Sequence, residues 1–225
     1  MYKERKAIKG YKLNQEVIRK RFTVKARAFN GIYSEGVSPF FRIFNRLFRW
    51  DIIARMESAF ERLIKDDVHD VLDVGCGTGR LSLELAKKGK RVWGLDFSTK
   101  MIEIAEELRK KNRVENIRFI CKDILSYSPR KQVDAAVALG FFDYTADPAV
   151  YLRKFTILTR KLLIATFPRK KTLRAVLRKI RLGLLGCPVY FYNFYQIKKL
   201  LEETGFNIVR HTIIGQLHYI EAQKK

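Results

Sequence analysis

Cysteine is scarce in this sequence. The 225 residues include only three cysteines, Cys76, Cys121 and Cys187, and no two of them form a Cys-x-x-Cys pair. Their odd number argues against a framework of disulfides and favours a reducing compartment. We therefore expect the protein to reside in the cytoplasm.

Long apolar runs and histidine clusters are lacking as well. The first ten residues are polar and basic, and no uncharged apolar run reaches the roughly 18 residues that a membrane-spanning helix needs. We expect neither a membrane span nor export by a standard signal. The three histidines, His69, His211 and His218, form no pattern typical of metal ligands, so we expect no metal site.

Acidic residues are few relative to basic ones. The chain has 23 Asp and Glu against 46 Lys and Arg, which gives a formal net charge of +23. Such a charge attracts nucleic acid, acidic lipid surfaces or acidic small molecules, and the net charge alone does not identify which of them is the partner. A lysine-rich, solvated surface of the kind found in heat-adapted proteins is the alternative interpretation.

The length fits one domain with a small appendage. Residues 1–66 lack the alternation of strands and predict a helical extension of two or three helices. Apolar residues recur there at helical spacing, and we expect their common face to pack on the main domain: Ile43, Leu47, Trp50, Ile53, Met56, Phe60, Leu63 and Ile64.

Residues 67–225 alternate between strand and helix patterns. Strands are predicted at 71–74, 91–96, 117–121, 133–139, 162–167, 206–211 and 216–222. Helices are predicted at 81–88, 98–111, from 147 onward, and at 193–205. The alternation predicts an α/β domain with a doubly wound, mostly parallel sheet that ends on a pair of strands.

A glycine-rich turn follows the first of these strands. Gly75, Gly77 and Gly79 stand where a doubly wound sheet presents backbone N–H groups and a helix N-terminus to a ligand. Their missing Cβ permits a sharp reversal and a close approach to the main chain. The spacing is G-x-G-x-G, and Arg80 follows Gly79, which departs from the G-x-G-x-x-G/A of dinucleotide-binding folds.

The stretch Val71-Leu72-Asp73-Val74-Gly75-Cys76-Gly77-Thr78-Gly79 resembles the first motif of class I S-adenosylmethionine-dependent methyltransferases. The segment 94–98 with Met101 resembles the second-strand motif of that family, and 121–124 resembles the third. The resemblance extends over about 68–220 and implies a seven-stranded Rossmann-like sheet that ends in an antiparallel hairpin. The region after the fourth strand, with Asp143-Tyr144 and Asp147-Pro148, is closer to the small-molecule branch of the family and more loosely resembles magnesium-protoporphyrin O-methyltransferases.

The resemblance implies S-adenosyl-L-methionine as cofactor and S-adenosyl-L-homocysteine as product. By this resemblance the cofactor-binding residues are Asp73, Gly75, Cys76, Gly77, Gly79, Asp96, Phe97, Met101, Asp123, Ile124, Leu139 and Tyr33. Asp96 would accept both ribose hydroxyls, and the alternative is a surface or capping aspartate. Asp123 would accept the adenine amino group, and its alternative is a helix-capping or loop carboxylate. Tyr33 would lie over the cofactor on an N-terminal helix.

No catalytic residue can be assigned from the sequence. Methyl transfer from a sulfonium is an in-line displacement, so alignment in a water-poor pocket supplies much of the rate, and only some acceptors need a base. Tyr33, Tyr144, Tyr192 and His218 are candidates near the carboxyl edge of the sheet. For each of them, ordinary packing is the competing interpretation.

Two features of the sequence constrain the methyl acceptor. One is a motif that is absent, and the other is an insert. The chain has Leu139-Gly140-Phe141-Phe142 where methyltransferases of base amino groups carry an Asn/Asp-Pro-Pro-aromatic tetrad, which disfavours that reaction. A basic amphipathic insert at about 169–192 would form either a lid on the domain or a surface for anionic lipid or a large acidic substrate.

We thus expect a methyltransferase of a small, hydrophobic or acidic molecule at oxygen or nitrogen. An RNA methyltransferase is the first rival, because the charge would suit phosphate contacts. A noncatalytic protein that keeps the pocket as a sensor or scaffold is the second. The oligomeric state does not follow from the sequence.

Overall fold

The computed structural model describes residues 39–170 and 188–225, with side chains from Trp50 onward. The first half contains α2 (Pro39–Leu63), β1 (Asp70–Val74), α3 (Arg80–Lys87), β2 (Arg91–Asp96), α4 (Thr99–Lys111), β3 (Ile117–Cys121) and the 3-10 turn η1 (Ile124–Ser126). The second half contains β4 (Val133–Ala138), the 3-10 turn η2 (Phe142–Tyr144), α5 (Pro148–Leu158), β5 (Thr159–Pro168), α7 (Phe194–Glu203), β6 (Phe206–Ile214) and β7 (Leu217–Lys224). The predicted α/β alternation is confirmed.

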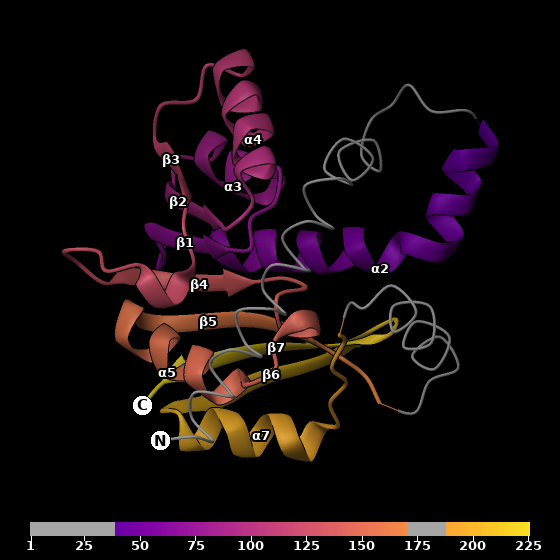
Figure 1. Ribbon diagram of the computed structural model, residues 1–225, viewed down its shortest axis with the longest axis vertical. Helices are drawn as coiled ribbons and strands as arrows, with labels where there is room; N and C mark the ends of the chain where they lie inside the picture. Colours follow the sequence, from indigo (N-terminus) through magenta and orange to yellow (C-terminus); the bar gives the residue numbers. More distant parts are fainter. Residues whose placement is uncertain (1–38, 171–187) are drawn as a thin grey trace, which may run out of the picture.

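The strands form one seven-stranded sheet in the order β3-β2-β1-β4-β5-β7-β6 (Figure 1). The pairs among β1 to β5 are parallel, whereas β7 runs antiparallel to both β5 and β6. The order reverses between β1 and β4, and in open α/β sheets ligands bind beyond the carboxyl ends of the strands at such a point. This confirms the Rossmann-like sheet that ends in a hairpin.

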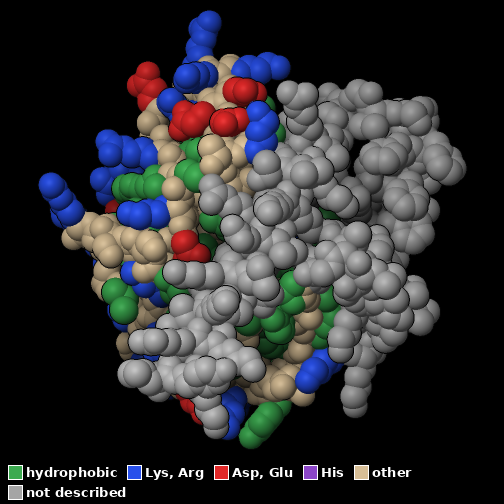
Figure 2. Space-filling model, in the orientation of Figure 1, with side chains coloured by type: hydrophobic (Ala, Val, Ile, Leu, Met, Phe, Trp, Pro, Cys, Tyr) green, Lys and Arg blue, Asp and Glu red, His purple; other side chains and the backbone are tan. Residues whose placement is uncertain are grey.

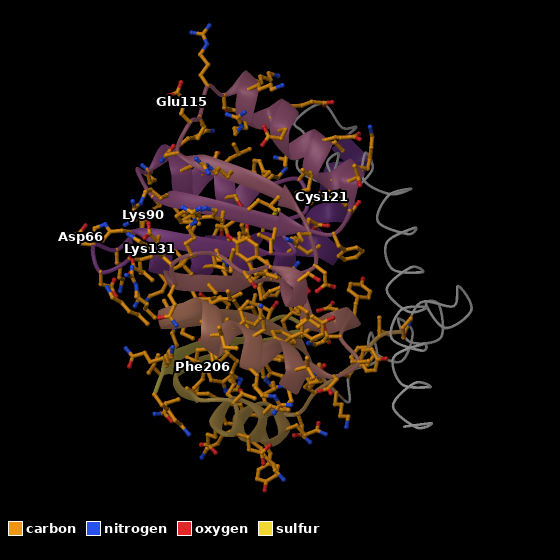
Figure 3. The ribbon with its side chains drawn as sticks, turned by 60° about the vertical axis from the view of Figure 1, so that its left-hand side comes forward. Asp66, Lys90, Glu115, Cys121, Lys131 and Phe206 are labelled. Atoms are coloured by element: carbon orange, nitrogen blue, oxygen red, sulfur yellow. The ribbon has the colours of Figure 1, made fainter. Side chains whose placement is uncertain are left out.

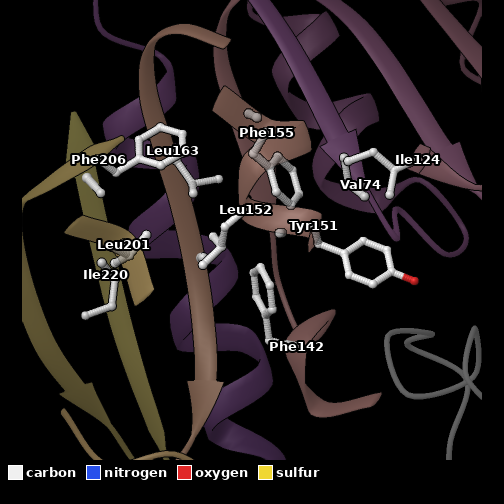
Figure 4. Close-up of a cluster of buried hydrophobic side chains, with 14 of the residues drawn as sticks. Val74, Ile124, Phe142, Tyr151, Leu152, Phe155, Leu163, Leu201, Phe206 and Ile220 are labelled. Carbon is white, nitrogen blue, oxygen red and sulfur yellow. The ribbon is translucent and has the colours of Figure 1, made fainter. Parts of the chain in front are cut away.

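Helices cover both faces of the sheet, because the buried strands alternate apolar residues between the two sides. Helices α5 and α7 bury one set of side chains against β4, β5 and β7, including Leu152, Phe155 and Leu201 (Figure 4). Helices α2 and α3 cover the opposite face with Leu63 and Leu85, among others. Two apolar layers therefore hold the sheet rigid beneath its carboxyl edge.

The predicted starts of three helices are confirmed by capping hydrogen bonds. The Ser98 hydroxyl accepts from the backbone N–H of Met101, and the Asp147 carboxylate accepts from the first turn of α5. Asn193 forms a capping box with Gln196 at the start of α7. Each cap satisfies N–H groups that the first turn of a helix leaves without partners, so these helices begin where the sequence predicted.

The prediction of which side chains of the N-terminal helix pack on the main domain is only partly correct. One helix, α2, crosses the sheet, and Ala59 and Leu63 are its buried side chains. Trp50 and Ile53 were expected to pack, but 45% and 39% of their surfaces are exposed. Trp50 lies beside the turn between β6 and β7, where its ring is 3.3 Å from the position of a Cβ at Gly215. Figure 1 shows the amino-terminal half of α2 running on past the strands.

Several predicted features lie outside the described residues. These are any helix before Pro39, the side chain of Tyr33, and most of the basic insert at 169–192, of which 171–187 is not described. Within the described ranges, no helix combines the length and apolarity needed to cross a membrane.

Candidate functional site

The glycine turn joins β1 to α3 at the carboxyl edge of the sheet. Gly75, Gly77 and Gly79 have φ angles of +71°, +55° and +73°, a region that residues with a Cβ rarely adopt. The N–H groups of Gly75 and Cys76 both donate to the Leu95 carbonyl of β2, at 2.8 and 3.0 Å. The turn is therefore fixed to the neighbouring strand as well as to its own.

Two of these glycines face different surroundings. A Cβ at Gly79 would overlap the ring of Phe119, so this position is closed by packing. A Cβ at Gly77 would meet no atom of the described residues within 4 Å. The turn thus presents open space beside the main chain at Gly77, which is the cradle that a ligand approaching the backbone requires.

Asp96 ends β2 and faces this turn. Its Oδ2 accepts from the backbone N–H of Gly77 at 3.0 Å, and its Oδ1 accepts from the N–H of Ser98 at 2.8 Å. The carboxyl is 9% exposed, and burial raises its pKa to about 6 although the backbone N–H groups oppose that rise. The structure therefore brings Asp96 and the glycine turn together, as the sequence predicted.

Asp73 lies beneath the turn as a second buried carboxyl. Its Oδ2 accepts from the hydroxyl of Ser82 on α3 at 2.6 Å. Burial raises its pKa to about 6, the Ser82 hydrogen bond opposes this, and the nearby charge of Asp96 adds to it. Asp73 thus connects β1 to the first turns of α3 and holds the glycine turn from below.

The remaining predicted residues on this side lie at the ends of β2 and β3. Met101 is 1% exposed in the first turn of α4, and Phe97 is partly buried. Asp123 caps the turn η1 by accepting from the N–H of Leu125 at 2.8 Å, and Ile124 is buried beside it. Figure 3 shows Cys121, at the end of β3, on the edge of the sheet opposite to Lys131, which precedes β4.

Cys76 lies within the turn itself and is partly buried. Burial raises the pKa of its thiol well above the usual value, and the charges of Asp73 and Asp96 add to that rise. A protonated thiol is a weak nucleophile, so Cys76 serves to line the turn rather than to react.

The end of β4 forms the other wall of the site. Gly140 has a φ of +75°, and its N–H donates to the hydroxyl of Thr166 on β5 at 2.8 Å. A Cβ at Gly140 would lie 3.0 Å from each terminal nitrogen of Arg55. The guanidinium of Arg55, on α2, therefore lies over this turn. Leu139, predicted to face the ligand, packs against the apolar cluster on the α2 side.

Phe141 links the two walls. Its ring carbon Cδ2 lies 3.5 Å from the position of a Cβ at Gly75. Edge-to-face contacts with Phe142, Tyr151 and Phe155, at centroid distances of 5.3, 5.1 and 6.1 Å, hold the ring in place. The site thus has an apolar aromatic side next to its polar glycine turn.

Two of the catalytic candidates, Tyr192 and His218, lie in different environments. The Tyr192 hydroxyl donates to the carbonyls of Phe142 and Thr145, both at 3.3 Å, and burial raises its pKa. It serves to pin the segment after β4. His218 lies at the start of β7, where burial lowers its pKa to about 4. Tyr144 belongs to η2, next to Phe142.

Sequence reasoning missed three residues of the site. Arg55, Ser82 and Thr166 contact it from α2, α3 and β5. No local pattern marks Arg55 or Thr166, because each meets Gly140 only through the packing of distant segments. Ser82 could have been found, since it lies three positions after Gly79 on the first turn of the helix that the glycine turn opens.

The described residues contain no group of three or more His, Cys, Asp or Glu side chains placed to hold a metal ion. Basic side chains are spread over the surface. On the face drawn in Figure 2 they lie in several separate groups, with acidic side chains among them at the end that holds α4.

Comparison with known proteins finds relatives among methyltransferases. Residues 71–161 match a family model described as a methyltransferase domain. The chain is 30% identical over 149 residues to a magnesium-protoporphyrin O-methyltransferase of Synechocystis, covering 62% of this chain and 64% of that protein. It is 33% identical over 104 residues to an (S)-coclaurine N-methyltransferase of Thalictrum flavum, covering 45% and 29% of the two chains. The match to a ubiquinone biosynthesis O-methyltransferase of Coxiella burnetii covers 44% of each protein at 32% identity.

The chain thus spans less than two thirds of the length of each of these relatives. Among solved structures, magnesium protoporphyrin IX methyltransferase from Synechocystis with bound SAH has a TM-score of 0.79 at 24% identity, covering 94% of this chain and all of that one. The cyclase SpnF has a TM-score of 0.71 at 16% identity, covering 92% and 94%. These likenesses establish the fold. With the family match, they identify residues 71–161 as a methyltransferase domain with the class I fold.

Proposed function

We propose that the chain binds S-adenosylmethionine at the glycine turn and transfers its methyl group to an oxygen or nitrogen of a small molecule. The contact between Gly77 and Asp96 carries this proposal, because it joins an open backbone cradle to a carboxylate at the end of the neighbouring strand. Relatives named for coclaurine, magnesium protoporphyrin and ubiquinone biosynthesis support a small-molecule acceptor over RNA.

The residues of the site fit the cofactor. Asp96 would accept hydrogen bonds from the ribose hydroxyls. Each of its oxygens accepts one hydrogen bond from a backbone N–H and has a lone pair left for a second donor. Asp123 and Ile124 would hold the adenine edge at the end of β3. The open space at Gly77 would receive the part of the cofactor that lies closest to the main chain. Of the predicted contacts, that of Tyr33 falls outside the described residues.

Arg55 would complete the site at the methionine end. Its guanidinium lies over Gly140, which follows the carboxyl end of β4. A guanidinium holds a carboxylate with two parallel hydrogen bonds, so Arg55 suits the carboxylate of the amino-acid part. Phe141 and the aromatic rings behind it would exclude water from the adjoining space.

The bound cofactor would supply an electrophilic methyl group on a sulfonium. The chain would contribute alignment and a water-poor wall, which supply much of the rate for a displacement in which charge disappears. Tyr192 is occupied by two carbonyls and His218 has a low pKa, so neither suits the role of a base fixed in this site. The proposal therefore assigns no general base and favours an acceptor that ionises readily.

Two further expectations form part of this proposal. The free thiols of Cys76 and Cys121 suit a reducing compartment such as the cytoplasm. The division between a helical cap at 1–66 and the methyltransferase domain at 67–225 is supported by the end of α2 at Leu63 and the start of β1 at Asp70.

Calorimetric titration with S-adenosylhomocysteine tests the cofactor site, and we expect saturable binding of one ligand per chain. Incubation with methyl-labelled S-adenosylmethionine and fractionated cell extract then tests the acceptor. We expect label in the pool of small molecules or lipids. Label in RNA would contradict the proposed acceptor class, and tight binding without label in any pool would support the sensor or scaffold instead.

A further inference from the structure

A hollow opens at the carboxyl end of β5, beside the hairpin of β6 and β7. Its volume is about 230 Å³, and its lining residues are Arg169, Lys170, Tyr192, Asn193, Phe194 and His218. Backbone hydrogen bonds fix the walls: the N–H of Tyr192 donates to the Pro168 carbonyl at 2.8 Å, and the N–H of Lys170 donates to the Tyr192 carbonyl at 2.9 Å. The hollow is therefore built from backbone that the sheet holds in place.

The hollow lies on the same edge of the sheet as the glycine turn. The strands β1, β4 and β5 are neighbours, so two interstrand spacings, about 10 Å, separate β1 from β5. The pairing places the end of β1 level with Ala165, and β5 continues to Pro168, so the two strand ends lie about 14 Å apart. His218 pairs with Phe167 across β5 and β7, and the Phe167 ring stacks on Phe142 with centroids 4.4 Å apart. An apolar contact thus runs from the residues after β4 to the wall of the hollow.

The charged side chains of the hollow are both basic. The Nη1 of Arg169 donates to the Gly215 carbonyl at 3.3 Å, which holds the guanidinium near the turn between β6 and β7. Lys170 is exposed. In the ranges that the structure describes, no carboxylate forms an ion pair with either of them. Two cations that share one concave surface without an acidic partner favour an anion there.

The opposite wall is aromatic. The ring of Phe194 stacks on His211 with centroids 4.1 Å apart and planes at 10°. The Nε2 of His211 and the Nδ1 of His218 lie 2.9 Å apart, so one ring donates to the other. Burial, together with the charges of His211 and Arg169, lowers the pKa of His218 to about 4. At neutral pH the histidines form an uncharged ring wall next to the two cations.

We propose that this hollow binds an acidic group, a carboxylate or a phosphate, carried by the methyl acceptor. The inference rests on the proposed function and narrows its substrate class. Arg169 and Lys170 would hold the acidic group, and the rings of Phe194 and Tyr192 would contact the apolar or aromatic part next to it. The acceptor would then be an amphiphile whose acidic group lies about 14 Å from the end of β1.

Titration with benzoate and with inorganic phosphate, at constant ionic strength maintained with chloride, tests the hollow without cofactor or turnover. The ring resonances of His218 report on it by NMR. We expect saturable shifts and a rise in the pKa of His218, because a nearby anion favours the protonated ring. Saturation by benzoate alone would assign a carboxylate, and saturation by phosphate alone would assign a phosphate.

Lys170→Gln and Lys131→Gln form a matched pair of variants. Both lysines are exposed, but Lys131 precedes β4 at the opposite edge of the sheet (Figure 3). We expect Lys170→Gln to weaken binding of the responding anion about fivefold or more, and Lys131→Gln to leave it unchanged. Equal weakening in both variants, or no saturable shift of His218 with either anion, would overturn the inference.

Titration of the same variants with S-adenosylhomocysteine separates the two proposals. Lys170→Gln should bind it as tightly as the unchanged protein does. If the unchanged protein fails to bind it, the proposed function is wrong, whereas the anion titration still decides the role of the hollow.

Discussion

The backbone N–H of Gly77 donates to Oδ2 of Asp96 at 3.0 Å, across the gap between the turn after β1 and the end of β2. The other oxygen of Asp96 accepts from the N–H of Ser98, which caps α4. One carboxylate therefore fixes the glycine turn and the start of the next helix. A ligand that donates hydrogen bonds to Asp96 would bind at the point where both elements meet.

Asp96→Asn should weaken binding of S-adenosylhomocysteine about 10- to 100-fold. The amide keeps the shape of the side chain, but it loses the charge and one acceptor that would receive the ribose hydroxyls, which are worth about 1.5–3 kcal/mol together. Calorimetry measures the change. Asp66→Asn, which removes an exposed carboxylate at the opposite edge of the sheet, is the control and should have no effect (Figure 3). Unchanged affinity of Asp96→Asn would show that Asp96 does not contact the ligand.

Asp73→Asn should stabilise the ligand-free protein more at pH 7.5 than at pH 4.5. Burial raises the pKa of Asp73 from 3.8 to about 6, so its contribution to stability is fully present below about pH 4 and is lost as the pH rises through 6. The asparagine cannot ionise, and its Oδ1 can still accept from the Ser82 hydroxyl. The gain in unfolding free energy between the two pH values should be about 2 kcal/mol, because the unfolded carboxyl is already partly ionised at pH 4.5. Urea denaturation at each pH measures it, and a constant difference between variant and unchanged protein would contradict the burial of the charged form.

Gly77→Ala and Gly89→Ala should separate ligand binding from backbone strain. Both glycines have positive φ, +55° and +83°, and a Cβ at either would meet no described atom within 4 Å. Each substitution should therefore cost a similar 1–2 kcal/mol or so of stability. Only Gly77→Ala should also abolish binding of S-adenosylhomocysteine, because its methyl group fills the open space of the turn. Thermal denaturation and calorimetry test the pair, and equal affinities of the two variants would exclude close approach of the ligand at Gly77.

Gly79 is unsuitable for the same test. Its Cβ would overlap the ring of Phe119, so Gly79→Ala would perturb the packing of α3 on β3 in addition to straining the backbone. Loss of binding in that variant would not distinguish a missing contact from a displaced helix.

Sequence patterns predicted the parts of this protein that depend on neighbours along the chain. The caps at Ser98, Asp147 and Asn193 and the place of Asp96 at a strand end follow from local spacing, because a few adjacent residues determine them. The strand limits were less accurate: β4 ends at Ala138, one residue earlier than predicted, since Gly140 turns its N–H toward Thr166.

The contacts of α2 could not be predicted in this way. Helical spacing identifies which side chains share a face, but it does not say how far the surface beneath them extends. Ala59 and Leu63 are buried against the sheet, whereas Trp50, beside the turn between β6 and β7, is 45% exposed and Ile53 is 39% exposed. The position of Arg55 over Gly140 depends on the same long-range packing, which no local pattern records.

Arg55→Ala should weaken binding of S-adenosylhomocysteine about 10-fold or more, while leaving binding of 5′-methylthioadenosine nearly unchanged. The second ligand lacks the amino-acid carboxylate that we assign to the Arg55 guanidinium, so the ratio of the two affinities isolates that contact. Arg130→Ala, which removes an exposed arginine before β4, controls for the change in net charge. Both ligands are titrated by calorimetry at several salt concentrations, because a general electrostatic effect would decline with salt in both variants. If Arg55→Ala weakened both ligands equally, its role would be to support the fold of the site and the carboxylate would bind elsewhere.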